Sequence, residues 1–158
     1  MKGDTGPITT LGYLLQHTAS TLYRQSDQVL QERLGLGMSQ FKILLMLQSH
    51  PHIKQRALAD YLGQTEASIS RQIKLLCDKG MLSMEINPKN RREHLTWLTT
   101  KGVKLVQAAQ DILAEYHAPV FDQFSDKESQ QFIELLSRMH IVACGPRKPI
   151  SCDRPFDI

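Results

Sequence analysis

The sequence has 158 residues, a formal net charge of +3 and 41% hydrophobic residues. This length suits one domain of ordinary size, and the hydrophobic content supplies a core, so the composition excludes disordered and fibrous proteins. No stretch approaches the roughly 18 apolar residues of a membrane helix, and the N-terminal stretch lacks the apolar centre of a signal peptide. We therefore expect a soluble, cytoplasmic protein.

Residues that carry enzyme or metal chemistry are sparse. The three cysteines, Cys77, Cys144 and Cys152, are odd in number and lack CxxC spacing, so neither a disulfide framework nor a zinc ribbon is indicated. The two imidazoles of the HPH segment at 50–52 have no neighbouring acidic or cysteine cluster, which favours a turn over a zinc site. The sequence contains no glycine-rich phosphate loop and no nucleophile elbow. We expect no cofactor, no metal and no enzymatic activity.

Positive charge is concentrated in the middle of the chain. Between residues 41 and 105 there are eleven Lys and Arg against five Asp and Glu, whereas the rest of the chain carries eight bases and eleven acids. A basic centre between acidic flanks is typical of a module that binds a polyanion, and an ordinary solvated surface is the alternative.

Helical spacing of apolar residues predicts two helices in the N-terminal third. The first runs from an N-cap at Thr9 or Thr10 to the GLG segment at 35–37 and is long for a globular helix. Ser39 is the predicted N-cap of the second, in which residues 41–47 are almost continuously apolar and therefore buried on most sides. The HPH segment ends this helix.

A short helix, a tight turn and a longer helix follow, with the spacing of a helix-turn-helix. The short helix, QRALADYL, ends at Gly63, and Thr65 opens the longer one. Steps of 100° per residue place Ile73 and Leu76 beside Ile69 on the buried side. The opposite side carries Ala67, Ser70, Arg71, Lys74 and Asp78. Small residues allow a helix to approach base edges closely in a major groove, and hydroxyl groups and Arg can read bases. Lys can neutralise phosphate. An ordinary solvated face is again the alternative.

A β-hairpin with a basic tip is predicted after this helix. Apolar and polar residues alternate in LSMEI, and HLTWL returns with β-branched and aromatic residues after the turn-rich loop NPKNRRE. The loop carries Lys89, Arg91 and Arg92, which places cations beside the preceding helix. A wing of this kind can enter the minor groove next to the major groove that the helix occupies.

Two further helices indicate an oligomer. One is capped by Thr99 or Thr100 and has apolar residues at helical spacing as far as Val120, and a capping box of Ser125 and Glu128 starts the last. Together with the first helix they present more apolar surface than a small winged domain covers. A larger, monomeric helical core is the alternative.

The segment LADYLGQTEASISRQIKLLCDKGMLSMEINPKNRREHLTWLTTKG resembles the winged helix-turn-helix core of the MarR family of bacterial transcription regulators. The family's wing pattern, D-P-x-D-x-R before an apolar strand and L-T-x-x-G, reads here as Asn87, Pro88, Lys89, Asn90, Arg91 and Arg92, then Leu98, Thr99, Thr100, Lys101 and Gly102. The resemblance covers nearly the whole chain. It implies a mainly α (α+β) fold, a winged helix-turn-helix with a two-stranded β-wing and long N- and C-terminal dimerisation helices.

The resemblance also implies a function. A homodimeric repressor would bind double-stranded DNA at an inverted-repeat operator, with half-sites about 10 base pairs apart, and a small ligand would release it. The residues expected to contact DNA are Thr65, Ala67, Ser68, Ser70, Arg71, Lys74, Lys89, Asn90, Arg91 and Arg92. Activation instead of repression stays open, and so does a winged adaptor that binds proteins without specific DNA recognition.

The implied organisation places all parts within one domain of the MarR type. Its predicted parts are an N-terminal dimerisation helix (1–37), a winged DNA-binding lobe (38–100), C-terminal dimerisation helices (101–143) and a Pro-rich tail (144–158).

Both aspartates of the family's wing pattern are asparagines in this chain, Asn87 and Asn90. Family members typically use the second aspartate to orient the wing arginine. Asn90 can accept a hydrogen bond from Arg92 but supplies no charge, so we expect a weaker pair and a more positive wing tip.

The resemblance implies a switch of one of two kinds. A small phenolic or anionic effector would bind in a cleft, for which Tyr13, His17 and Tyr23 are candidate lining residues; core or interface packing is the alternative for these side chains. Oxidation would act on Cys144 and Cys152, which flank the start of the Pro-rich tail. Cys77 is expected to be structural.

Overall fold

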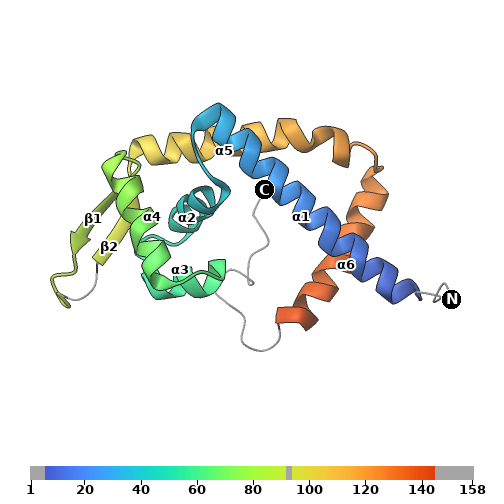
Figure 1. Ribbon diagram of the computed structural model, residues 1–158, viewed down its shortest axis with the longest axis horizontal. Coiled ribbons are helices and arrows are strands. Elements are labelled where there is room, and N and C mark those ends of the chain that lie inside the picture. Colours follow the sequence, from blue (N-terminus) through green and yellow to red (C-terminus); the bar gives the residue numbers. More distant parts are fainter. Residues whose placement is uncertain (1–5, 92–93, 145–158) are drawn as a thin grey trace. The chain divides into compact units, whose positions relative to one another are not determined.

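The computed structural model describes residues 6–91 and 94–144 and is mainly helical, as predicted (Figure 1). The chain forms two compact units, Met1–Met38 and Ser39–Ile158. Among the described residues, no helix is long and apolar enough to cross a membrane. The elements in chain order are α1 (Pro7–Leu34), α2 (Met38–Ser49), α3 (Gln55–Leu62), α4 (Glu66–Asp78), β1 (Leu82–Ile86), β2 (His94–Leu98), α5 (Thr100–Phe121) and α6 (Asp126–Cys144).

Helix α1 begins earlier than predicted. Pro7 is its first residue and Gly6 its N-cap, and the backbone N–H groups of Thr9 and Thr10 both donate to the Gly6 carbonyl. The predicted cap at Thr9 or Thr10 is therefore wrong, because proline already has the φ of a helix and lacks the N–H that the first turn leaves unpaired. The predicted end is confirmed, since Gly35 adopts the left-handed conformation at φ 61°.

Helix α2 begins at Met38, so the predicted N-cap at Ser39 is also wrong. The Met38 N–H donates to Oδ1 of Asp27 at 2.7 Å, and this carboxylate acts as the cap from eleven residues earlier in the chain. The predicted burial is confirmed, because the core includes Phe41, Ile43, Leu44, Met46 and Leu47.

The helix-turn-helix is formed by α3 and α4 as predicted. Leu58 and Ala59 are buried, and Gly63 ends α3 at φ 61°. Thr65 caps α4, because its Oγ1 accepts a hydrogen bond from the Ser68 N–H at 3.2 Å.

The predicted hairpin is present, with Leu82 opposite Leu98 and Ile86 opposite His94. Leu82 is buried, whereas Met84 and Ile86 on the same face are exposed, so the hairpin leaves the core along its length. The loop before α3 also joins the hairpin, since the N–H of His52 donates to the Thr96 carbonyl at 3.0 Å.

Helix α5 is held against the connection between α4 and β1. Thr99 caps it, as predicted, by accepting from the Gly102 N–H, and the Thr99 hydroxyl donates to the Gly80 carbonyl at 2.7 Å. A Cβ on Gly102 would overlap the carbonyl oxygen of Met81. Glycine at this position therefore permits the close approach of the two backbones.

Helix α6 starts with the predicted capping box. The Ser125 N–H and hydroxyl both donate to Oε2 of Glu128, which holds the pKa of this carboxyl below its usual range. Most of the apolar side chains of α6 are exposed, namely Phe132, Ile133, Leu135, Met139, Ile141 and Val142.

Candidate nucleic-acid interface

Helix α4 separates its side chains into a buried and an exposed side, as predicted. Ile69, Ile73 and Leu76 are at most 1% exposed. On the opposite side, the predicted contact residues are exposed, namely Thr65, Ala67, Ser70, Arg71 and Lys74. The exposed side is narrow and small near the helix start and carries two cations further along, so this helix can approach a polyanion without a steric barrier.

Charges of both signs lie along the exposed residues of α4. The helix dipole places partial positive charge at the first N–H groups, and the exposed Glu66 carboxylate in the same turn opposes it. Arg71 and Lys74, one and two turns beyond Ala67, supply the positive charge of this helix side.

Ser68 lies differently from the other predicted contact residues of α4. Its side chain is half-buried, and its hydroxyl donates to Oε1 of Gln64 at 3.1 Å. The hydroxyl is thus engaged with the turn that precedes the helix, on the side of α4 opposite Ser70.

The wing tip is shaped by an asparagine-led turn. Oδ1 of Asn87 accepts from the Lys89 N–H at 2.9 Å, and the Asn87 carbonyl accepts from the Asn90 N–H at 3.0 Å. An Asx-turn of this kind fixes the backbone locally. Lys89, Asn90 and Arg91 are exposed at this turn. Arg92 lies outside the described residues, so its pairing with Asn90 stays a prediction.

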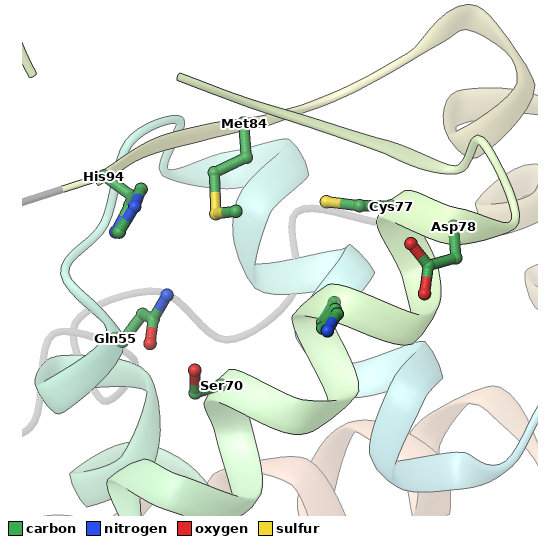
Figure 2. A pocket seen from close by; sticks show the side chains of 7 residues that line it. Gln55, Ser70, Cys77, Asp78, Met84 and His94 are labelled. Atoms are coloured by element: carbon green, nitrogen blue, oxygen red, sulfur yellow. The ribbon is translucent and has the colours of Figure 1, made fainter. Parts of the chain in front are cut away.

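A hollow of about 460 Å³ lies between α4 and the hairpin (Figure 2). Met84 and His94 reach into it from the two strands, and Ser70 and Cys77 line it from α4. Its complete lining is Gln55, Ser70, Lys74, Cys77, Asp78, Met84 and His94. The hollow therefore shares Ser70 and Lys74 with the exposed side of α4.

The sequence did not predict several residues that line this hollow. Gln55 comes from the first turn of α3, next to the exposed Arg56, and Met84 and His94 come from the hairpin. The strand alternation contained part of the signal, because Met84 must share a face with Leu82. The approach of α3 to this face had no local signal.

Of the three cysteine side chains, the structure describes that of Cys77. Cys77 is half-buried, and burial, with a smaller effect of the Asp78 charge, raises the pKa of its thiol. A raised pKa disfavours the reactive thiolate, in keeping with a structural role. Cys144 ends α6 but its side chain lies outside the described residues, as does all of Cys152, so their oxidation stays a prediction.

The predicted effector-binding residues all lie on α1, where Tyr13, His17 and Tyr23 are exposed. The rings of Tyr13 and His17 stack, with centroids 5.6 Å apart and an interplanar angle of 11°. Within residues 6–91 and 94–144, no group of three or more His, Cys, Asp and Glu side chains could hold a metal ion.

Comparison with known proteins finds winged-helix transcription regulators. The sequence model of the MarR family matches residues 36–94. The transcriptional regulator HosA of Escherichia coli O111:H- is 25% identical over 124 residues, which cover 78% of this chain and 92% of that protein.

Two solved structures are similar to this fold. A MarR transcriptional regulator from Methanosarcina mazei Go1 has a TM-score of 0.70 and 29% identity, over 80% of this chain and 94% of that one. A mutant of Staphylococcus aureus MepR, solved bound to an oligodeoxyribonucleotide, has a TM-score of 0.57 and 27% identity, over 82% of this chain and 94% of that one. These relatives are regulators, and none of them is an enzyme.

Proposed function

This chain belongs to the MarR family of winged helix-turn-helix transcriptional regulators, and from this premise we propose a homodimeric repressor that binds an inverted-repeat operator in double-stranded DNA. The observation that carries the proposal is the division of α4. Ile69, Ile73 and Leu76 are buried on one side. Ser70, Arg71 and Lys74 are exposed together on the other side. Such a helix, followed by a hairpin with a basic tip, suits a major groove and the minor groove beside it.

The contact residues divide into two classes. Near the helix start, Thr65 and Ala67 are small enough for close approach to base edges, and Ser70 and Arg71 supply donors for base reading. Lys74 serves as a phosphate contact, as do the cations of the wing, where the expected residues are Lys89, Asn90, Arg91 and Arg92. Arg56, exposed in the first turn of α3, is a further phosphate contact, because the first helix of such a motif crosses the DNA backbone.

Dimer formation is supported by the exposed apolar side of α6. Phe132, Leu135 and Met139 are each more than 40% exposed and recur at helical spacing. A contiguous apolar stripe of this length is typical of a protein–protein interface. A second copy of the chain would cover it and set two α4 helices against successive major grooves, roughly 34–36 Å apart.

Selection of sheared genomic DNA from the source organism, with the full-length protein at near-physiological salt, tests the proposal. We expect the sequenced bound fragments to share an inverted repeat. Arg71→Ala should relax the base preference at one position of each half-site by about 1–3 kcal/mol. Lys74→Ala should weaken binding to all DNA sequences alike and reduce the salt slope of binding by about 1. Lys127→Ala on α6 is the matched control.

The opposite outcome of this selection is equally informative. Weak binding without any enriched sequence, by a folded dimer, would contradict the proposal and favour an adaptor that binds acidic protein surfaces. A promoter–reporter assay with an enriched fragment then separates repression from activation, because a repressor lowers reporter output.

We also propose that a small phenolic or anionic effector releases the DNA. The hollow beside α4 supports this step, because Met84 and His94 suit an aromatic ring. The Lys74 ammonium suits an anionic group at the end of the hollow that faces away from the Asp78 carboxylate, one turn further along α4. An occupant there would compete directly for Ser70 and Lys74. The exposed residues Tyr13, His17 and Tyr23 of α1 mark the alternative location.

Calorimetric titration of DNA-free protein with salicylate, a simple phenolic anion, distinguishes the two locations. We expect Met84→Glu to abolish binding, because it places a carboxylate in the hollow that repels an anion, and Tyr13→Ala to leave binding unchanged. The reverse pattern would place the effector on α1, and no heat with the wild-type protein would count against a phenolic anion as the effector.

A further inference from the structure

A closed set of hydrogen bonds joins the start of α2 to one flank of α4. Oγ of Ser39 accepts from Nε2 of Gln64 at 2.6 Å and from Nε2 of Gln72 at 3.1 Å. Oε1 of Gln64 accepts from Nε2 of Gln72 at 3.0 Å and from the hydroxyl of Ser68 at 3.1 Å. We call these four residues the glutamine–serine network.

The donors and acceptors of the network match one another. The two protons on Nε2 of Gln72 serve two acceptors, and Oε1 of Gln64 uses both of its lone pairs. Turning the Gln72 amide alone by 180° would set its oxygen against Oε1 of Gln64, and turning the Gln64 amide alone would set the two amide nitrogens against each other. All four side chains are only partly exposed, which strengthens each bond relative to one in open water.

The network occupies one flank of α4. Ser68 and Gln72 are four residues apart and lie on one side of the helix, and Gln64 lies in the turn before it. Ser70 is on the opposite side. The apolar contacts of the buried side are not directional, so they hold the helix on the core but tolerate small rotations about its axis. Hydrogen bonds at two levels of the helix do not tolerate such rotations.

We propose that Ser39, Gln64 and Gln72 are positioning residues that set the rotation of α4 about its axis, and with it the preference for one DNA sequence. The inference rests on the proposed function, since it concerns how that same helix reads bases. Ser68 then supports the helix through Gln64, and does not itself contact a base.

The size of the effect follows from the geometry of a helix. With side chains, a helix is roughly 10–12 Å across, so a rotation of about 10° moves a contacting atom by about 1 Å. A base contact tolerates donor–acceptor distances of about 2.7–3.2 Å, so it would be lost. Attraction between Lys74 and a phosphate falls slowly with distance and would persist.

Two substitutions remove the network with little change in volume or helix propensity. Gln72→Met keeps the length of the side chain but loses both of its hydrogen bonds, and Ser39→Ala removes the shared acceptor. Ser39→Thr retains the hydroxyl and is the conservative rescue. Gln110→Met, at an exposed position of α5, is the matched control.

The readout is the ratio of two affinities, one for a duplex that the wild-type protein enriches from genomic DNA and one for a scrambled duplex of equal length. We expect Gln72→Met and Ser39→Ala to lower the ratio about tenfold or more, as for the loss of one base contact, with the scrambled affinity and the salt slope unchanged. Ser39→Thr and Gln110→Met should keep the wild-type ratio. Melting curves confirm that each preparation is folded, and loss of active protein affects both affinities equally.

Two results would overturn the inference while leaving DNA recognition intact. One is an unchanged ratio in both variants; the other is an equal fall in both affinities, as expected for a residue with a merely structural role. A wild-type protein without any sequence preference would instead overturn the proposed function, and the inference with it.

Discussion

Helices α4 and α6 are both amphipathic, yet they differ in what covers their apolar sides. On α4, Ile69, Ile73 and Leu76 are almost completely buried by the chain's own α3 and hairpin. On α6, apolar residues at similar spacing remain exposed, with Phe132 at 45% and Leu135 at 54%. An amphipathic pattern thus predicts that one face of a helix is buried, but it does not identify what buries it. The same chain buries that face only where its other elements pack against it.

The largest expected effect comes from the same substitution on the two helices. Leu76→Ala should lower the free energy of unfolding by about 2–5 kcal/mol at any protein concentration, because it leaves a cavity in the core. Leu135→Ala should cost less than about 0.5 kcal/mol in a dissociated chain and more where a dimer is populated. Denaturation at two widely separated protein concentrations measures both; a concentration-independent loss for Leu135→Ala would contradict a covering partner.

Gly102→Ala tests the joint that holds α5 against the winged lobe. We expect the free energy of unfolding to fall by an amount near the upper end of about 1–3 kcal/mol. The new methyl group would overlap the Met81 carbonyl, which belongs to the backbone and cannot rotate away. Gly12→Ala in α1, where nothing lies within 4 Å of the added atom, should stabilise by up to about 1 kcal/mol. Thermal melting of both variants checks this, and equal shifts would refute the close approach.

Thr99→Ala should destabilise the same joint more mildly, by about 1 kcal/mol, because it removes the cap of α5 and the bond from the hydroxyl to the Gly80 carbonyl. Thr99→Ser keeps the hydroxyl and should restore most of the loss in urea denaturation. A serine variant as unstable as the alanine variant would show that the methyl group, and not the hydrogen bonds, matters.

The smallest expected effect is the pH response of His117 on α5. Burial lowers the pKa of this imidazole below its usual value of about 6.5, so the folded state favours the neutral ring. The stability that this adds is fully present above a pH of about 6.5 and is lost as the pH falls from there through the lowered pKa. We expect His117→Gln to reduce the loss of stability between about pH 7.5 and about pH 5.5, measured by urea denaturation. Equal losses in both proteins would rule this histidine out as a cause.

Local chemistry made much of the winged lobe predictable. The apolar period of α4 identified its buried side. The start of α4 near Thr65, and Thr99 as one of two candidate caps of α5, were predictable because a cap bonds within its own first turn. The wing tip was equally readable from the turn residues Asn87 to Asn90. The candidate site was predictable to the same extent, on the exposed side of α4 and at the wing.

The amino-acid sequence by itself therefore determined which helix faces require cover and which residues of α4 are left for a partner, since both depend on neighbours within a few residues. Only the tertiary structure decided that Asp27 caps α2, that Gln72 bonds to Ser39, and that Gln55 and His94 line one hollow with Ser70. These pairs lie eleven or more residues apart. Their partners are chosen by how whole elements pack, and no local pattern of residues encodes that choice.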